Sequence, residues 1–192
     1  MIGRNSALFL ASLSCLMFLS SITNAAEGEP PQVGDVIEDV AVKNLQGESV
    51  KLFDVAGDGP VVILVLRGYP GYQCPICTRQ VGQYIGSAKK FQAAHTKVVM
   101  IYPGPGVGLT EKANEFLKDA SLPENFVFVT DPDYVFTNAW NLRWDAPRET
   151  AYPSTFVLDP EHKVLFTHIS KTHGNRTAPA DVLKVLSEPA AN

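Results

Sequence analysis

The sequence predicts an α/β fold in which a central mixed sheet is flanked by helices and extended by strands at its N-terminal end. Residues 61–66 and 97–102 are short apolar runs, as expected for strands buried on both faces. Apolar residues at helical spacing follow the first run, so a helix is expected to about Ala94. The later segments complete a βαβ half joined to a ββα half.

The other elements follow from local patterns. Short apolar pieces on either side of a turn-like Asn-Leu-Gln-Gly at residues 44–47 predict two short strands within residues 33–53. Thr110 is a plausible cap for the next helix. The remaining predicted elements are, in chain order, a helix at 110–117, a strand at 126–130, a short helix or turn at 133–140, strands at 154–158 and 164–168 joined by a hairpin turn, and an amphipathic helix at 179–186.

Residues 1–25 have the pattern of a secretory signal peptide. Arg4 supplies a positive start, residues 7–22 are nearly all apolar or small, and small residues surround a cleavage point at Ala25. The apolar stretch is at the short end of what spans a bilayer, and no cationic cluster follows it, which favours cleavage over a membrane anchor. We therefore expect an exported protein, periplasmic or secreted and not integral to a membrane, with one domain at residues 32–187.

Charge and cysteine content narrow the function classes. The formal net charge is −4 and no basic cluster is present, which argues against a nucleic-acid partner. Cys15 lies in the expected signal peptide, so the exported chain would keep Cys74 and Cys77. A single close pair in an exported chain is more often catalytic than structural.

Cys74-Pro75-Ile76-Cys77 directly follows a predicted buried strand and opens the predicted helix. The unpaired N–H groups and the dipole at a helix N-terminus favour a thiolate, and the second thiol lies one turn further on. Pro75 fits the first turn, where its missing N–H is not needed. Zinc needs about four ligands, and the chain has no second cysteine pair, so we predict a redox-active dithiol with no metal and no cofactor.

Several segments together carry a family resemblance. They are Arg67-Gly68 before the Cys-Pro-Ile-Cys motif, Val-Gly-Asp at residues 33–35, the turn at Gly47 and Tyr-Pro-Ser-Thr-Phe-Val-Leu-Asp at residues 152–159. On these motifs the chain, from about Gln32 to Leu186, resembles the AhpC/TSA (peroxiredoxin-like) redoxins of the thioredoxin-fold superfamily. The resemblance implies a thioredoxin-like fold, a peroxide or protein disulfide as substrate, and an external dithiol reductant.

The chain departs from the peroxiredoxin pattern at two places. Peroxiredoxins carry Pro-x-x-x-Thr/Ser-x-x-Cys, and at residues 70–77 Cys74 takes the hydroxyl position, so that Cys77 would be the peroxidatic thiol. In the thioredoxin register, Cys74 is instead the exposed attacking thiol and Cys77 resolves it. The arginine that peroxiredoxins place shortly before the Phe-Val-Leu-Asp strand is also missing, and Arg67 is a possible substitute.

We therefore expect Cys74 and Cys77 to be catalytic, and Arg67, Pro75, Tyr152 and Pro153 to position the substrate. The resemblance implies a cis peptide before Pro153, opposite the dithiol, which would let the Tyr152 backbone pair with an extended substrate. Arg67 would either lower a thiolate pKa or pair with an acid such as Asp131.

Three functions remain open. Antioxidant peroxide reduction is the first choice, and thiol–disulfide exchange is the second. A copper-binding chaperone that uses both thiols with His168 or His173 is the third.

Overall fold

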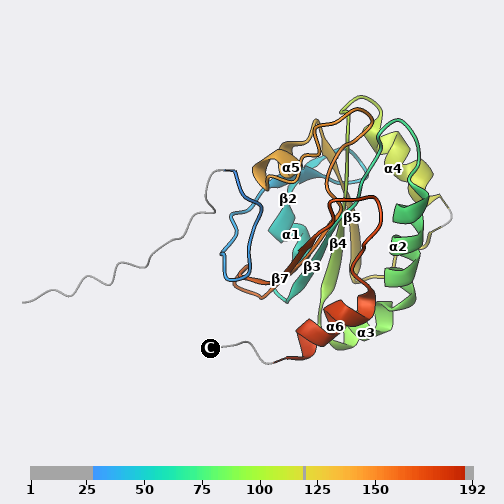
Figure 1. Ribbon diagram of the computed structural model, residues 1–192. Coiled ribbons are helices and arrows are strands. Elements are labelled where there is room, and N and C mark those ends of the chain that lie inside the picture. The colour runs from blue at the N-terminus through green and yellow to red at the C-terminus, as the bar shows by residue number, and fades with distance from the viewer. Residues whose placement is uncertain (1–27, 119, 189–192) are drawn as a thin grey trace, which may run out of the picture.

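The computed structural model describes residues 28–118 and 120–188, and within them a seven-stranded mixed sheet has the order β2-β1-β5-β4-β3-β6-β7 (Figure 1). The expected signal peptide, residues 1–25, lies outside the described residues. None of the helices described is long and apolar enough to cross a membrane. The strands are β1 (Ala41–Lys43), β2 (Ser49–Lys51), β3 (Val61–Val65), β4 (Lys97–Gly104), β5 (Phe126–Pro132), β6 (Ser154–Leu158) and β7 (Val164–Ile169). The helices are α1 (Leu52–Ala56), α2 (Pro75–Gly86), α3 (Ala88–Ala93), α4 (Leu109–Leu117), α5 (Val135–Ala139) and α6 (Pro179–Ser187).

Strand pairing confirms the two predicted halves. β3, β4 and β5 are parallel neighbours, with Val61 opposite Lys97 at the start of the first pair, because helices connect them across one face of the sheet. β6 runs antiparallel to β3, and β7 forms a hairpin with β6. The hairpin turn closes where the His162 N–H donates to the Asp159 carbonyl at 3.0 Å.

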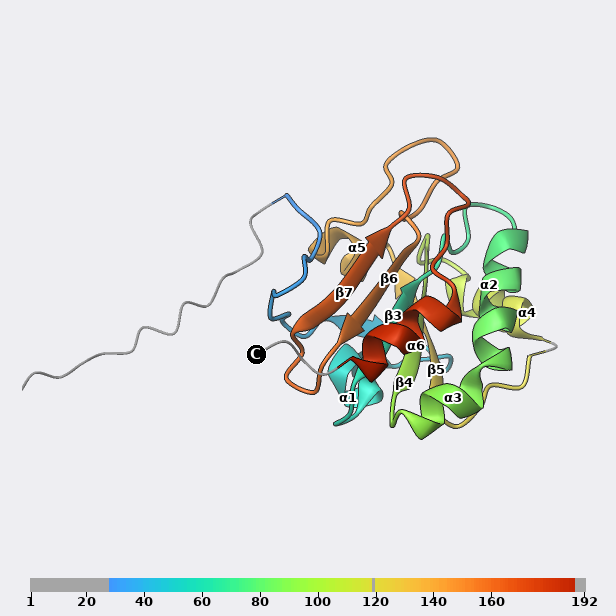
Figure 2. The same ribbon diagram turned by 60° about the horizontal axis from the view of Figure 1, so that its bottom comes forward.

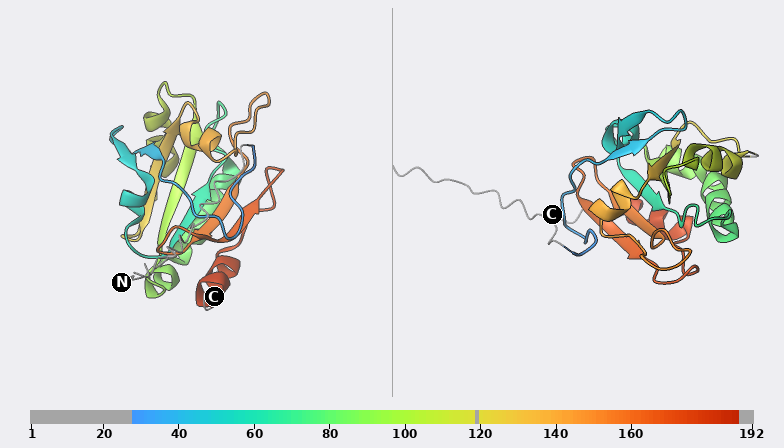
Figure 3. Two further views of the ribbon diagram at one scale, coloured as in Figure 1. Left: turned by 90° about the vertical axis from the view of Figure 1, so that its left-hand side faces the viewer. Right: turned by 90° about the horizontal axis from the view of Figure 1, so that it is seen from above.

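Both faces of the sheet are covered, which explains why β3 is a continuous apolar run. Val62 and Leu64 lie in a core cluster shared with α2, α3, α4 and α6. Val61, Ile63 and Val65 point to the other face, where α1 and α5 pack. Figure 3 shows these helices on the two sides of the sheet, seen from the side and from above.

Two predicted helix boundaries are wrong. The helix after the cysteines does not continue to Ala94, because α2 ends at Gly86 and α3 begins at Ala88. Gly86 and Ser87 are weak helix formers, and the Ser87 N–H closes the end of α2 on the Tyr84 carbonyl. Thr110 is not a cap either, because Gly108, with φ of 70°, precedes the first residue of α4.

Candidate active site

The two thiols lie where the loop after β3 enters α2. Cys74 is the N-cap of α2 in extended conformation, and its Sγ accepts a hydrogen bond from the Cys77 N–H at 3.2 Å. Pro75 occupies the first turn, as expected. Both cysteines are free thiols, and the side chains of Cys74 and Cys77 are 2% and 0% exposed. The expectation of an exposed Cys74 is therefore wrong, because Cys74 packs within the core cluster on the α2 face of the sheet.

The thiol pair is electrostatically asymmetric. A hydrogen bond from the Cys77 thiol lowers the pKa of Cys74 to about 6 against the opposing effect of burial, helped by the Cys77 N–H and the charges of Arg176 and Arg67. The same thiol–thiol hydrogen bond, together with burial, raises the pKa of Cys77 well above its usual value. The first ionisation belongs to the pair, and the hydrogen bonds to the Cys74 sulfur favour the negative charge at that atom.

Arg67 lies just after β3 and is almost fully buried. Its Nε donates to Glu149 Oε2 at 2.6 Å, one Nη donates to the Arg148 carbonyl at 2.7 Å, and the other donates to the Tyr72 hydroxyl. Arg67 therefore pairs with an acid, as one of the two expectations had it, but the acid is Glu149 and not Asp131. The Asp131 carboxylate instead accepts the N–H groups at the start of α5.

Arg176, in the loop between β7 and α6, was not predicted as a site residue. One Nη lies 3.9 Å from Cys77 Sγ, and the other donates to Gln80 Oε1 at 3.0 Å. Its Nε donates to the His173 carbonyl at 2.9 Å. The signal in the sequence was indirect, because the missing family arginine indicated that another cation was needed, and Arg67 was the substitute that the motif suggested.

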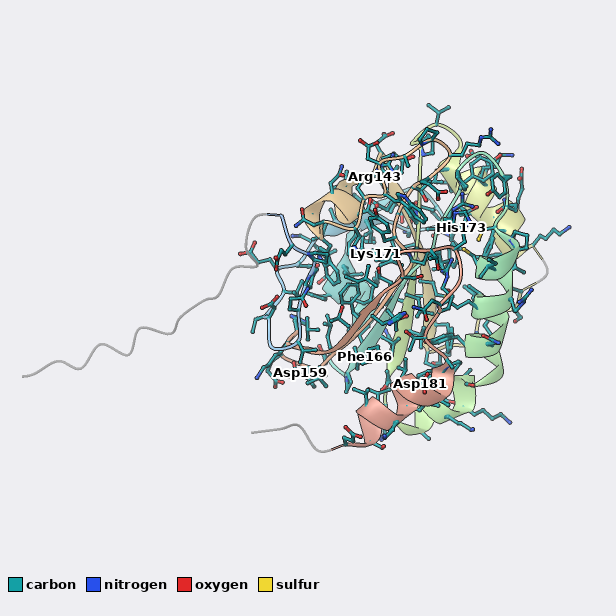
Figure 4. All side chains as sticks on the ribbon, viewed as in Figure 1. Arg143, Asp159, Phe166, Lys171, His173 and Asp181 are labelled. Atoms are coloured by element: carbon teal, nitrogen blue, oxygen red, sulfur yellow. The ribbon has the colours of Figure 1, made fainter. Side chains whose placement is uncertain are left out.

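Glu149 connects the loop after β3, which carries Arg67, with the loop after β7, which carries His173. Its Oε1 lies 2.8 Å from His173 Nε2, while its Oε2 binds Arg67. Burial raises the pKa of this carboxyl, but Arg67 and His173 outweigh burial and hold the pKa below its usual value. Figure 2 shows the loop before β6 and the loop after β7 side by side near the start of α2, and Figure 4 labels His173 in the second loop.

The cis peptide expected before Pro153 is absent. No cis peptide bond occurs within residues 28–118 and 120–188, so the peptide before Pro153 is trans, the form that X–Pro bonds favour by about 0.5–1 kcal/mol. The Tyr152 N–H donates to the Leu142 carbonyl at 2.9 Å, and its carbonyl accepts from Ser154 Oγ at 2.8 Å. The Tyr152 N–H is thus used within the chain, and its carbonyl already accepts one hydrogen bond.

The two histidines of the copper hypothesis form hydrogen bonds to groups other than the thiols. His168 Nε2 is 2.8 Å from the Asn175 carbonyl, and His173 is bonded to Glu149. In the part of the chain that the structure describes, no three His, Cys, Asp or Glu residues are grouped so as to hold a metal ion. The geometry therefore lends no support to a metal site at Cys74 and Cys77.

A groove of about 620 Å³ runs between α2 and α4 beside the dithiol. Gln73 and Thr78, which flank the cysteines in sequence, line it, but the two cysteines do not. Gln73 is held by Tyr102, whose hydroxyl donates to Gln73 Oε1 at 2.7 Å. The groove therefore approaches the dithiol without exposing either sulfur.

A sheet of this topology with a dithiol at the start of α2 defines a thioredoxin-fold thiol protein. The chain matches the model of the AhpC/TSA family over residues 33–167, and it belongs to that family. It is accordingly a thiol oxidoreductase of the peroxiredoxin-like class.

Solved structures agree on the fold. Peroxidoxin BcpB from Mycobacterium tuberculosis is 22% identical, with 80% of this chain and 95% of that chain covered and a TM-score of 0.61. A peroxiredoxin-like protein from Aquifex aeolicus is 14% identical, with 83% and 88% covered and a TM-score of 0.66. A yeast mitochondrial 1-Cys peroxiredoxin, described with glutathione and thioredoxin systems that resolve its thiol, is 20% identical, with 81% and 75% covered and a TM-score of 0.61. None of the curated proteins searched matches the chain.

Proposed function

We propose that this chain is an exported antioxidant peroxidase that reduces peroxides through a Cys74–Cys77 dithiol/disulfide cycle. The observation that carries the proposal is the position of Cys74 as N-cap of α2, where its sulfur accepts hydrogen bonds from both the N–H and the thiol of Cys77. These donors favour the thiolate, which is the reactive form of cysteine.

The cycle needs no group beyond the two thiols, a peroxide and a dithiol. The Cys74 thiolate attacks one peroxide oxygen, so that an S–O bond forms, the O–O bond breaks, and the leaving oxygen takes a proton to become water or an alcohol. The Cys77 thiol then attacks the sulfenic sulfur of Cys74, which releases water and forms the disulfide. An external dithiol returns both cysteines to thiols and is itself oxidised to a disulfide.

Burial of the dithiol supports peroxide over a protein disulfide as the oxidising substrate. A protein disulfide must bring one of its sulfur atoms to a thiolate, whereas both thiols are covered in the reduced form, which is the form that meets the oxidising substrate. The Tyr152 N–H, which would help to dock an extended substrate, is already paired within the chain. A peroxide needs only a path wide enough for a small molecule.

Two arginines support the chemistry. Arg176 and Arg67 place positive charge near the pair, which stabilises the thiolate and the negative charge on the leaving oxygen. Cys74, however, takes the position where a peroxiredoxin hydroxyl would help to hold the peroxide. We therefore expect turnover that is real but slower than in a peroxiredoxin with the full motif.

Export and the electron donor are also part of the proposal. The signal pattern of residues 1–25 supports a periplasmic or secreted location. The yeast 1-Cys peroxiredoxin, whose thiol is resolved through glutathione and thioredoxin systems, supports a thiol-based reductant for this chain as well. Cell fractionation with an antibody to the mature chain would test the location, and a protein found in the cytosol at full precursor mass would contradict it.

One assay separates the two redox functions. The same purified protein and the same dithiol donor are used to follow consumption of hydrogen peroxide and reduction of insulin disulfides. We expect peroxide consumption that is lost in both Cys74→Ser and Cys77→Ser. Brisk disulfide reduction with no peroxide consumption would instead assign the chain to thiol–disulfide exchange.

A further inference from the structure

Glu149 is the point at which the two cation-bearing segments around the thiols meet. Its side chain is 11% exposed, and it accepts hydrogen bonds from the nearly buried Arg67 on one oxygen and from His173 on the other. It touches neither sulfur. A carboxylate shared in this way fixes the relative position of its two partners.

Each partner of Glu149 leads to Cys77. On one side, the backbone N–H of Arg67 opposes the rise in the pKa of Cys77. On the other side, the His173 carbonyl accepts from Arg176 Nε, and this bond orients the guanidinium whose Nη lies 3.9 Å from Cys77 Sγ. Glu149 therefore ties together the two segments that approach the sulfur from different strands of the sheet.

We propose that Glu149 is a positioning residue for the dithiol: it holds Arg67 directly and, through His173, the loop that presents Arg176 to Cys77. The inference rests on the proposed function, since it assigns a role in the thiol chemistry. It concerns a carboxylate in the segment between α5 and β6, which no motif of the sequence singled out.

Two roles of Glu149, holding the arginines in place or acting only as a nearby negative charge, predict opposite changes in the thiol pKa when Glu149 is lost. If Glu149 acted only as a nearby negative charge, its neutralisation would favour the thiolate and lower the pKa of the pair. If it holds Arg67 and Arg176 in place, its loss lets those cations move away and raises the pKa. The direction of the change thus distinguishes the two roles.

The test is a titration of thiolate absorbance at 240 nm in the reduced mature chain, which lacks Cys15, and it requires neither peroxide nor electron donor. For Glu149→Gln we expect the first thiol midpoint to rise by about one pH unit. Asp145→Asn is the matched control, because it removes a carboxylate from the same segment at a side chain that is 96% exposed, and we expect its midpoint to equal that of the wild type. An unchanged or lowered midpoint in Glu149→Gln would overturn the proposal, and this readout stands even if peroxide turnover is absent.

A second variant covers the case in which Glu149→Gln fails to fold. His173→Ala removes the partner that is 45% exposed and leaves the Arg67–Glu149 pair in place. We expect a smaller rise of the same midpoint, together with a loss of peroxide rate that is largest near pH 6 and small near pH 8. With Arg176→Ala as background, His173→Ala should add little further shift, whereas an equal shift in both backgrounds would show that His173 does not act through Arg176.

Discussion

Arg176 presents a guanidinium nitrogen 3.9 Å from the Sγ of Cys77, although the two residues are 99 positions apart in the chain. The family motif places its arginine just before β6, where this chain has Tyr152 and Pro153. A cation therefore reaches the dithiol from the loop after β7 and not from the start of β6. This difference makes Arg176 the first residue to test.

Replacing Arg176 with alanine should weaken the thiolate and slow its reaction. The variant loses a positive charge beside the pair and the contact with Cys77 Sγ. We expect a fall of about five- to ten-fold in the peroxide rate constant near pH 6, measured by stopped-flow. Arg176→Lys should recover part of the loss, because it restores the charge but not the forked hydrogen bonds.

Arg79→Ala is the control for this prediction. It removes one positive charge from an exposed position on α2. An equal loss in Arg79→Ala and Arg176→Ala would mean that only the net charge of the region matters.

The order of thiol reactivity follows from the asymmetry of the pair. Because the pKa of Cys74 is lowered to about 6 and that of Cys77 is raised, iodoacetamide at mildly acid pH should label Cys74 first. Mass spectrometry of the trapped protein gives the labelled position. Earlier labelling of Cys77, with peroxide activity retained in Cys74→Ser, would establish the peroxiredoxin register instead.

The pH profile of peroxide reduction should follow the same ionisation. The pKa of Cys74 is lowered, so its thiolate is present above about pH 6 and is lost as the pH falls through that value. The rate constant should then rise about ten-fold for each pH unit below the midpoint and become level near pH 8. Rapid-mixing measurements from pH 4.5 to 9.5 test this, and a rate that keeps rising to pH 9 would indicate an ordinary thiol.

The parts of the fold that were predicted correctly depend on local sequence. β3 and β4 are continuous apolar runs because both faces of the sheet are covered, and such runs are visible without a structure. Cys74 and Cys77 could be placed at a strand-to-helix junction because they follow such an apolar run and precede residues at helical spacing. The break at Ser87 was missed because both sides of it keep the apolar spacing of a single helix.

The parts of the site that were missed depend on contacts between distant segments. Glu149 and His173 are 24 positions apart, and Arg67 and Glu149 are 82 apart, so no local pattern connects them. The cis peptide expected at Pro153 came from the family resemblance and not from local sequence. In this chain the peptide is trans, and the Pro153 carbonyl accepts the Ser170 N–H at 2.9 Å.

Among the glycines in the loop between β3 and α2, we expect Gly68 to tolerate substitution least. Its φ is 70°, and a Cβ at this position would lie 1.8 Å from the Pro103 carbonyl oxygen, which already accepts the Tyr69 N–H. Gly68→Ala must therefore move the loop away from β4, and we expect a loss of at least about 2 kcal/mol in the free energy of unfolding. Gly82→Ala is the matched control, because Gly82 lies within α2 with open space around its Cβ position, and alanine there should stabilise the fold by about 0.5–1 kcal/mol. Urea denaturation of both variants measures the difference, and equal midpoints would show that the loop can relax around an alanine at position 68.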